Sequence, residues 1–319
     1  MHHFITGVAG FIGSHLADSL LADGHRVSGM DDFSLGRREF LDGARASGNF
    51  HLVDGDCSAP ENVRDALCVV SAWGGGPDMI WHMAANSDIA AGSMDASIDF
   101  HRTLRTTYAV IEAARTAGVQ AMAFASSSAV YGERDDLLTE DSGPLLPISN
   151  YGAAKLAGEG LVSAAAESFL KTAWIFRFPN VVGPRPTHGV IFNFCQRLAK
   201  DPSRLEVLGD GKQEKAYLHV SELIGALRFI CSRATAKRNV FNIGPQGDCT
   251  RVSFIAENTV AVMAPQARIA YGSADRGWIG DVPRFRYSAE KLAQLGWRQT
   301  MSSDAAVLRA IPEIAAAVR

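Results

Sequence analysis

Tyr151 and Lys155 are the two residues whose types and spacing best suit acid–base chemistry. They stand four positions apart in the segment YGAAK, and this spacing places both side chains on one face of a helix. A free tyrosine has a pKa of about 10 and is a poor base at neutral pH. A nearby ammonium lowers that pKa because it stabilises the phenolate. The pair therefore predicts a tyrosine base, although the same spacing also occurs by chance on exposed helices.

A cluster of serines lies upstream of this pair. Ser126, Ser127 and Ser128 follow the apolar run Ala121–Ala125, which we expect to be a strand. A hydroxyl at the carboxyl end of a parallel strand faces the crevice where such sheets bind ligands. It can relay a proton or hold a substrate oxygen. A serine cluster is more often a turn, but serines, tyrosine and lysine in this order favour a catalytic site.

The segment GVAGFIG, residues 7–13, follows the apolar run Phe4–Thr6 and opens a helical pattern. Glycines at these positions permit a tight turn, let the backbone approach a pyrophosphate and let the helix pack closely on the sheet. Amides at the helix N-terminus face the phosphates. Asp31 comes 18 residues after Gly13, where a carboxylate accepts hydrogen bonds from both ribose hydroxyls of NAD and repels the 2′-phosphate of NADP. The pattern predicts an NAD site; a turn at Asp31-Asp32 is the alternative.

Further positions complete the expected cofactor site. Asp56 could bond the adenine amine, although a solvated turn aspartate is nearly as good an interpretation, and small residues at Ala84-Ala85 would let the cofactor pass. Oxidised nicotinamide would add its charge to that of Lys155; lowering the pKa of Tyr151 from about 10 to about 7 needs roughly 4 kcal/mol. The candidate NAD-binding residues are Gly7, Gly10, Phe11, Ile12, Gly13, Asp31, Asp32, Asp56, Cys57, Ala84, Ala85, Tyr151, Lys155 and Phe178.

Alternating strands and helices must position these residues. Apolar runs predict strands at Phe4–Thr6, Arg26–Met30, Phe50–Val53, Met79–Met83, Ala121–Ala125 and Thr172–Phe178. Amphipathic stretches predict helices at Ile12–Ala22, Pro60–Val70, Ile98–Ala117 and Tyr151–Phe169. This β-α-β-α order implies an α/β fold with a Rossmann doubly wound parallel sheet.

The pattern changes after Phe178, where Pro179, Gly183, Pro184 and Pro186 crowd one stretch and predict a boundary. A later apolar run at 240–243 predicts one more buried strand. We expect residues 1–178 to form an NAD-binding domain with a returning strand near 239–244. Residues 179–319 would form mostly a smaller, interleaved C-terminal substrate domain.

Composition limits the partners. The chain has 319 residues, 47% of them hydrophobic, and a net charge of −3, which offers no long-range field for nucleic acid or an anionic membrane. No apolar run approaches the roughly 20 residues of a membrane span. The cysteines form no CxxC pair and no zinc-like spacing. We expect no metal site, and buried, reduced thiols in a cytoplasmic protein; the cysteines are Cys57, Cys68, Cys195, Cys231 and Cys249.

Together these motifs resemble the extended short-chain dehydrogenase/reductase family, in its NAD-dependent epimerase/dehydratase group, and in particular UDP-glucose (UDP-galactose) 4-epimerases. The resemblance covers nearly the whole chain and includes HMAAN, SSSAVYG, YGAAK, NVVGPR, HGVIFNF and VLGDG. It implies that Tyr151 takes the proton of the sugar 4-hydroxyl while hydride passes from C4 to tightly bound NAD. The 4-keto sugar then rotates about its phosphate linkage and takes the hydride back on its other face.

The resemblance also assigns site residues. The catalytic set is Ser127, Tyr151 and Lys155, with Ser128 as the second choice of hydroxyl. Substrate contacts would come from Ser127, Ser128, Asn180, Val190, Val207, Leu208, Lys215, Arg276 and Phe285. In the family these positions hold a phosphate (Asn180), the uracil (Val207 and Leu208) and the diphosphate (Lys215 and Arg276). The large Phe285 stands where relatives gate an N-acetyl group, and it favours plain hexoses.

The sequence departs from the family at several positions. Thr103 replaces an asparagine, and Lys215 replaces an arginine whose bidentate guanidinium is not equivalent to an ammonium. Arg276 stands four residues before Gly280 rather than two, and Ser288 replaces an aspartate. These departures bear on the substrate more than on the reaction class.

Several alternatives stay open. Dehydratases of this family carry Asp-Glu after the catalytic threonine, and decarboxylases a glutamate after it; Ser128-Ala129 stand here instead. The other interpretations are a 4-epimerase of UDP-glucuronate or UDP-GlcNAc, an enzyme for a sugar on another nucleotide, a dehydratase and a decarboxylase. A non-catalytic NAD sensor or scaffold is a further alternative. Helices 98–117 and 151–169 resemble the family's dimer helices and predict a homodimer, unless their apolar faces contact only the sheet. We expect His82 and His219 to be structural, whereas His188 could touch substrate.

Overall fold

The computed structural model describes residues 1–134, 136–245, 247, 249–274 and 286–318. Its centre is a parallel sheet of seven strands in the order β12-β7-β5-β4-β1-β2-β3. The order reverses at β1, which is where doubly wound sheets bind dinucleotides. This confirms the predicted fold class. The strands are β1 (His2–Thr6), β2 (Arg26–Asp31), β3 (Phe50–Asp54), β4 (Met79–His82), β5 (Ala121–Ala125), β7 (Thr172–Arg177) and β12 (Arg238–Asn242).

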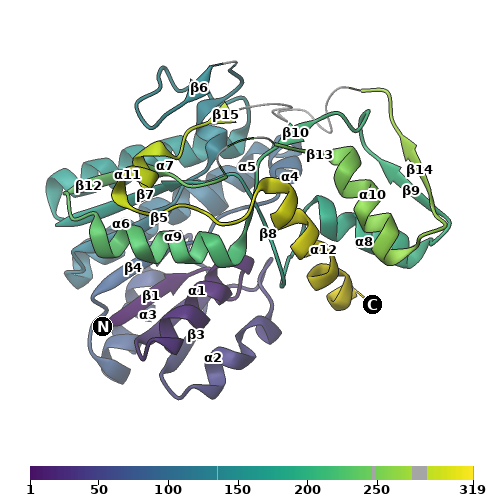
Figure 1. Cartoon of the computed structure of the whole chain (residues 1–319). Helices are drawn as coiled ribbons and strands as arrows, with labels where there is room; N and C mark the ends of the chain where they lie inside the picture. Colours follow the sequence, from purple (N-terminus) through teal and green to yellow (C-terminus); the bar gives the residue numbers. More distant parts are fainter. Residues whose placement is uncertain (135, 246, 248, 275–285, 319) are drawn as a thin grey trace.

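Helices cover both faces of this sheet (Figure 1). Successive strand residues point to opposite faces, so Phe4 packs in one core and Ile5 in the other. The Ile5 side is covered by α1 (Phe11–Ala22), α9 (Val220–Arg233) and α11 (Glu290–Leu295). The Phe4 side is covered by α3 (Pro60–Gly74), α6 (Thr106–Ala117) and α7 (Asn150–Ser168).

A separate core forms beside the sheet, in the lobe that holds the C-terminus (Figure 1). Its helices are α8 (Val190–Lys200), α10 (Val252–Met263) and α12 (Ser303–Val318), and β9 (Arg204–Val207) pairs with β14 (Arg268–Tyr271). The chain crosses between the two parts more than once. Helix α9 packs on the sheet and β12 pairs within it, whereas α8 and α10 lie in the second core. The division into domains at residue 178 stays a prediction.

The remaining elements are short. They are η1 (Arg38–Leu41), α2 (Asp42–Ala46), α4 (Ile89–Met94), α5 (Ala96–Asp99), η2 (Phe100–Arg105), η3 (Ser128–Tyr131), β6 (Leu137–Leu138), β8 (Asn180–Val182), β10 (Glu214–Lys215), β11 (Tyr217–His219), β13 (Thr250–Arg251) and β15 (Arg286–Tyr287). Within the described residues, no helix has the length and hydropathy that crossing a membrane requires.

The predicted helix 98–117 is confirmed in extent, because residues 96–117 are helical throughout, but its first part is not a regular α-helix. The structure interrupts it with the π-helical segment η2 between α5 and α6. At this junction the hydroxyl of Thr107 donates to the carbonyl of Thr103 at 2.7 Å, and that of Thr106 to the same carbonyl at 2.9 Å. Such side-chain bonds compete with the regular helical ladder, and π segments are frequent at functional sites.

One expectation about the cysteines is wrong. Cys57 and Cys195 are buried, but Cys68 is exposed. The helical period of α3 explains this, because Val63, Leu67 and Val70 face the core and leave residue 68 on the outer side.

Candidate functional site

A cleft of about 670 Å³ runs from the carboxyl ends of the sheet strands to the second lobe. It brings together every predicted site residue that the structure describes: Gly7, Gly10, Phe11, Ile12, Gly13, Asp31, Asp32, Asp56, Cys57, Ala84, Ala85, Ser127, Ser128, Tyr151, Lys155, Phe178, Asn180, Val190, Val207, Leu208 and Lys215. The other two predicted residues, Arg276 and Phe285, lie outside the described residues.

The glycine loop is built for close approach. Gly7 has φ +70°, and a Cβ on Gly13 would lie 2.1 Å from the Gly7 carbonyl oxygen, so neither position accommodates a side chain. Helix α1 begins after Gly10 with no side-chain cap and no acidic residue in its first turn. Its first amides therefore remain available to an anion such as a pyrophosphate.

Asp31 ends β2 beside this loop. Its Oδ2 accepts a hydrogen bond from the Ala9 amide at 2.8 Å, and its Oδ1 accepts one from the Phe33 amide at 2.9 Å. Burial raises the pKa of the carboxyl, and the amides oppose that shift. Each carboxylate oxygen has a second lone pair, so the fixed carboxylate can still accept the two ribose hydroxyls. The loop and Asp31 together fit NAD.

Tyr151 and Lys155 lie in the first turns of α7. Ser149 caps this helix by accepting a hydrogen bond from the Gly152 amide at 3.1 Å. Lys155 is buried, and its Nζ donates to the Ala125 carbonyl at 2.6 Å, which anchors it to the end of β5. The same Nζ lies 5.7 Å from the centre of the Tyr151 ring. The helix thus places the ammonium beside the phenol, as the spacing predicted.

Burial has the largest effect on the pKa values of Lys155 and Tyr151. It lowers the pKa of Lys155 to about 7 and raises the pKa of Tyr151 to about 12, although a hydrogen bond with Ser127 works to lower the latter. The expectation that Lys155 lowers the pKa of Tyr151 is therefore not met by the residues of the chain alone, because desolvation penalises the phenolate more strongly. The other contribution expected from the sequence is the charge of oxidised nicotinamide.

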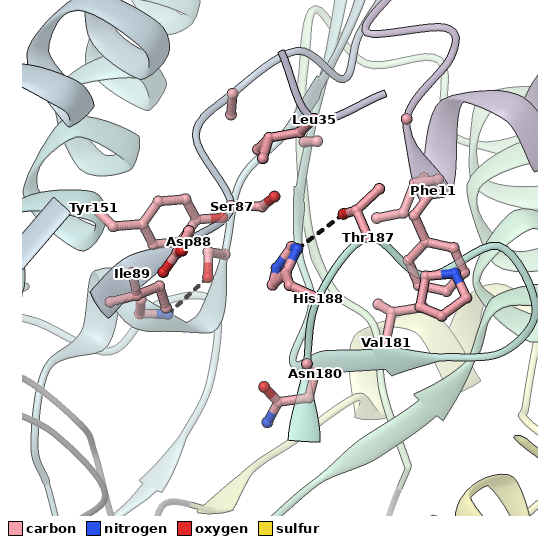
Figure 2. Close-up of a pocket in the computed structure, with 18 of the residues that line it drawn as sticks. Phe11, Leu35, Ser87, Asp88, Ile89, Tyr151, Asn180, Val181, Thr187 and His188 are labelled. Atoms are coloured by element: carbon pink, nitrogen blue, oxygen red, sulfur yellow. Dashed lines mark hydrogen bonds between the residues drawn. The ribbon is translucent and has the colours of Figure 1, made fainter. Parts of the chain in front are cut away.

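Residues of the second half of the chain form the far wall. Asn180 begins β8, Val190 begins α8, and Lys215 lies in β10. Figure 2 shows Tyr151 and the loop with Ser87 and Asp88 on one side of the pocket, with Asn180 and His188 extending into the same space from another segment. The cofactor half and the predicted substrate half therefore share one cavity.

Sequence reasoning missed several cleft residues. They include Ser87, Asp88, Arg102, Thr187, Asn193 and Arg197. The motifs HMAAN, NVVGPR and HGVIFNF lie beside or over several of them, and His188, at the start of the last motif, does line the cleft. His82, by contrast, is fully buried between the hydroxyls of Thr6 and Thr107, at 2.7 and 3.0 Å, which confirms its structural role.

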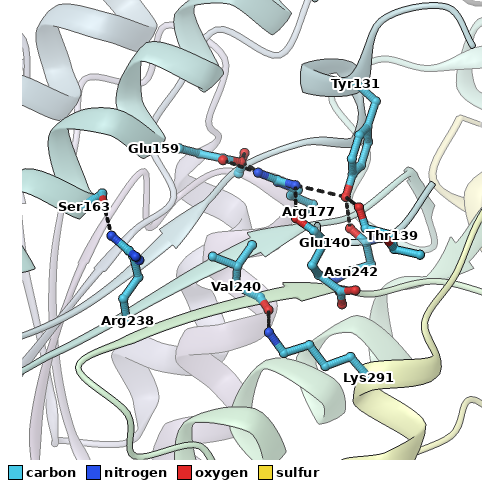
Figure 3. Close-up of polar contacts among 11 residues, drawn as sticks. Tyr131, Thr139, Glu140, Glu159, Ser163, Arg177, Arg238, Val240, Asn242 and Lys291 are labelled. Carbon is cyan, nitrogen blue, oxygen red and sulfur yellow. Dashed lines mark hydrogen bonds and ion pairs between the residues drawn. The ribbon is translucent and has the colours of Figure 1, made fainter. Parts of the chain in front are cut away.

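A buried polar network links Glu159 on α7 to Arg177 on β7 and Tyr131 on η3 (Figure 3). The Ser126 hydroxyl donates to Glu159 Oε1 at 2.5 Å, and Arg177 holds both oxygens of that carboxylate. Arg177 Nη1 also donates to the Tyr131 hydroxyl at 3.0 Å, and this hydroxyl donates to Asn242 Oδ1 at 2.7 Å. The network ties α7 to the ends of β5, β7 and β12, next to Ser127.

Known proteins are similar to this chain in sequence and fold. The model of the "NAD dependent epimerase/dehydratase family" matches residues 3–244. UDP-glucose 4-epimerase of Mycolicibacterium smegmatis is 33% identical over 231 residues, covering 71% of this chain and 72% of that protein. A solved structure of a UDP-galactose 4-epimerase has a TM-score of 0.87 and 34% identity, with both chains covered completely.

A second solved structure is the UDP-glucose 4-epimerase of Thermus thermophilus in complex with NAD. It has a TM-score of 0.84 and 28% identity over 98% of this chain and 99% of that one. The resemblance drawn from the sequence motifs is thereby confirmed. The chain belongs to the NAD dependent epimerase/dehydratase family, and its cofactor is NAD.

Proposed function

We propose that this protein interconverts UDP-glucose and UDP-galactose by epimerisation at C4, through a transient 4-keto sugar. The observation that carries the proposal is the shared cleft, in which Ser127, Tyr151 and Lys155 meet the wall that holds Asn180 and Lys215. The names of the relatives at 33% and 34% identity support the same reaction.

Each residue of the site has a separate role in the proposed reaction. Tyr151 accepts the proton of the sugar 4-hydroxyl and returns it, and Ser127 holds the sugar oxygen beside the phenol. Lys155, anchored on Ala125, places a positive charge against the phenolate that forms. NAD, when bound, supplies the reversible oxidation of the sugar carbon. Lys215, with Arg276, takes the diphosphate, Asn180 a phosphate oxygen, and Val207 and Leu208 the base.

The residues after the catalytic serine favour epimerisation over elimination or decarboxylation. Removing water from C5 and C6 requires a further acid and base close to the sugar. Ser128 and Ala129 occupy the two positions where dehydratases of the family carry that pair. Epimerisation needs no such groups, because the same tyrosine accepts and returns the proton.

The test is to incubate the purified protein with UDP-galactose, without added cofactor, and to follow the anomeric signals by proton NMR. Appearance of UDP-glucose supports both 4-epimerisation and tightly held NAD. No conversion, even with added NAD, contradicts the proposed substrate. UDP-glucuronate and UDP-GlcNAc are then assayed, and we expect the latter to turn over more slowly because of Phe285.

Tyr151→Phe separates an enzyme from an NAD-binding scaffold. We expect turnover to fall by roughly 10²–10⁴-fold, the range that a lost general base costs, while NAD stays bound. Bound NAD is measured by denaturing the variant and quantifying the released dinucleotide. Undiminished turnover would contradict the role of Tyr151, and absence of turnover in the parent protein would favour the scaffold.

The protein is further proposed to be a cytoplasmic homodimer. The outer face of α7 carries Ala153, Ala157, Gly160 and Ala164, all exposed and spaced by one helical turn. Beside it, Phe100 on η2 and Tyr108 on α6 are about half exposed. Small residues on one helix and large apolar residues on its neighbour fit a two-fold four-helix interface.

A further inference from the structure

Asp99 is a buried carboxylate on α5, which packs against the helix that carries Tyr151 and Lys155. It ends α5, with 1% of its surface exposed. Its Oδ1 accepts a hydrogen bond from Asn86 Nδ2 at 2.9 Å, while Oδ2 is buried and accepts none from any residue that the structure describes. A Cβ on residue 92 would approach Oδ2 to 1.9 Å, so Gly92 leaves the space that this oxygen fills. The carboxylate is therefore held in place from two sides.

The segment that carries Asp99 packs on the helix that carries the catalytic pair. Both α5 and η2 contact α7. The backbone amide of Asn86 donates to the Thr103 hydroxyl of η2 at 3.1 Å. The negative charge of Asp99 raises the pKa of Lys155 and also that of Tyr151. On Lys155 it is the largest effect that opposes burial.

The other titratable groups near Lys155 are paired, neutral or at the surface of the cleft. Glu159, one turn later on α7, is held at both oxygens by Arg177 from β7. His82, on β4, is kept neutral because burial lowers its pKa to about 3. Other charged or titratable groups on neighbouring segments are Asp88, Arg102 and His188, which line the cleft, and His101 and Arg105 of η2, which are exposed. Tyr131 of η3 is bonded to Arg177. Among the described residues, Asp99 is thus a buried carboxylate without a hydrogen-bonded cation, on a segment that packs against the helix of Lys155.

We propose that Asp99 is a positioning residue, the buried counter-ion that keeps Lys155 in its charged form so that the ammonium can stabilise the Tyr151 phenolate. A lysine in a dry site otherwise loses its proton. An unpaired buried carboxylate is itself costly, so the two groups stabilise each other. This role rests on the proposed function of Tyr151 and Lys155.

Asp99→Asn tests the role of the charge. The amide keeps the shape and the contact with Asn86 and removes only the negative charge. We expect the pKa of Lys155 to fall by roughly one unit, because its ammonium loses its counter-ion. The readout is the pH titration of the Lys155 side chain by NMR of the isotope-labelled, NAD-loaded protein, with the signal assigned from Lys155→Met. Asp99→Glu, which retains the charge, should titrate close to the parent protein.

Asp95→Asn is the matched control. Asp95 caps the same helix, and its carboxylate accepts from the Ser97 amide at 2.9 Å but is exposed. We expect no shift in this variant. If Asp99→Asn lowers stability or turnover while the titration stays in place, Asp99 is merely structural and the proposal is wrong.

A double-mutant cycle in melting temperature tests the proposal if Asp99→Asn alone does not fold. Lys155→Met leaves Asp99 buried without its cation, so adding Asp99→Asn on that background should raise the melting temperature. The same change in the parent protein should not. An effect of equal sign and size on both backgrounds overturns the proposal. The titration and the melting temperatures use no sugar, so they stand or fall independently of the epimerase assay.

Discussion

Arg177 grips Glu159 with two parallel hydrogen bonds, Nε to Oε1 at 2.9 Å and Nη2 to Oε2 at 2.7 Å, and both side chains are more than 90% buried. The pair joins β7 to α7 one helical turn after Lys155. Because Ser126 also donates to Glu159, the strand end that carries Ser127 is fixed by the same carboxylate.

Breaking this pair should strongly destabilise the protein. Arg177→Met leaves Glu159 as an uncompensated buried charge, for which we expect a loss of about 3–5 kcal/mol in the free energy of unfolding. Urea unfolding followed by circular dichroism measures it. The double variant Glu159→Leu/Arg177→Met should recover much of the loss, since no charge remains buried. A double variant as unstable as Arg177→Met would refute the charge argument.

A methyl group on Gly13 should disable the dinucleotide site. The new Cβ would lie 2.1 Å from the Gly7 carbonyl oxygen, so the loop must shift away from the phosphate position. A misfit of about 1.4 kcal/mol is enough for a tenfold loss, and we expect NAD affinity to fall by more than that. Isothermal titration calorimetry on the NAD-depleted protein provides the measurement.

Gly225→Ala is the control for this change. Gly225 lies on the exposed side of α9, and its nearest neighbour would be Trp297 Nε1 at 4.0 Å. This variant should bind NAD as the parent protein does. Equal affinities for Gly13→Ala and Gly225→Ala would show that the loop tolerates the methyl group.

Buried histidines should make the fold sensitive to acid. Burial lowers the pKa of His82 to about 3 and that of His3 to about 4, from an ordinary value of 6.5. Between pH 6.5 and these values the unfolded chain binds protons that the folded chain does not, so stability falls as the pH falls through this window. A pKa that is lower by one in the folded chain than in the unfolded chain corresponds to about 1.4 kcal/mol.

His3→Gln isolates one of these contributions. The amide does not titrate, so the variant should lose less stability between pH 7 and pH 4 than the parent protein, even if it is less stable at pH 7. Urea unfolding at a series of pH values measures the slope. Parallel curves for the two proteins would mean that His3 takes up its proton while folded.

The proposed dimer predicts a sharp effect at the outer face of α7. Ala157→Glu places a charge at the centre of the small-residue face, so we expect light scattering to give half the parent mass. Ala72→Glu, on the exposed side of α3, should leave the mass unchanged. A parent protein that is already monomeric would remove this proposal without affecting the others.

Local patterns were sufficient for much of the fold and the site. The strands needed only runs of apolar residues, and the observed bounds of β1, β2 and β7 lie within two residues of the predicted ones. Tyr151 and Lys155 could be paired from the helical spacing alone. The glycine loop could be placed because a strand, a turn and a helix follow each other directly in sequence.

Features that depend on tertiary contacts could not be predicted in this way. The π-helical segment η2 has no periodic signal, because it depends on which carbonyls Thr106 and Thr107 contact. Glu159 and Arg177 lie on different elements, and nothing in their spacing indicates that they pair. Asp99 looks in sequence like a surface residue of an amphipathic helix; only the packing of α5 on α7 makes it a buried charge.

The place of β12 in the sheet has a consequence for synthesis on the ribosome. β12 covers the free edge of β7, yet it is translated after α8, β9 and α9. Until residues 238–242 emerge, the nascent sheet exposes the unpaired backbone of β7, and such an edge is prone to pair with another chain. A fragment that ends near residue 178 keeps the complete glycine loop and the three candidate catalytic residues, Ser127, Tyr151 and Lys155, but never covers that edge. Aggregation of such fragments is therefore expected, and isolated expression of the cofactor half should require β12 to be supplied.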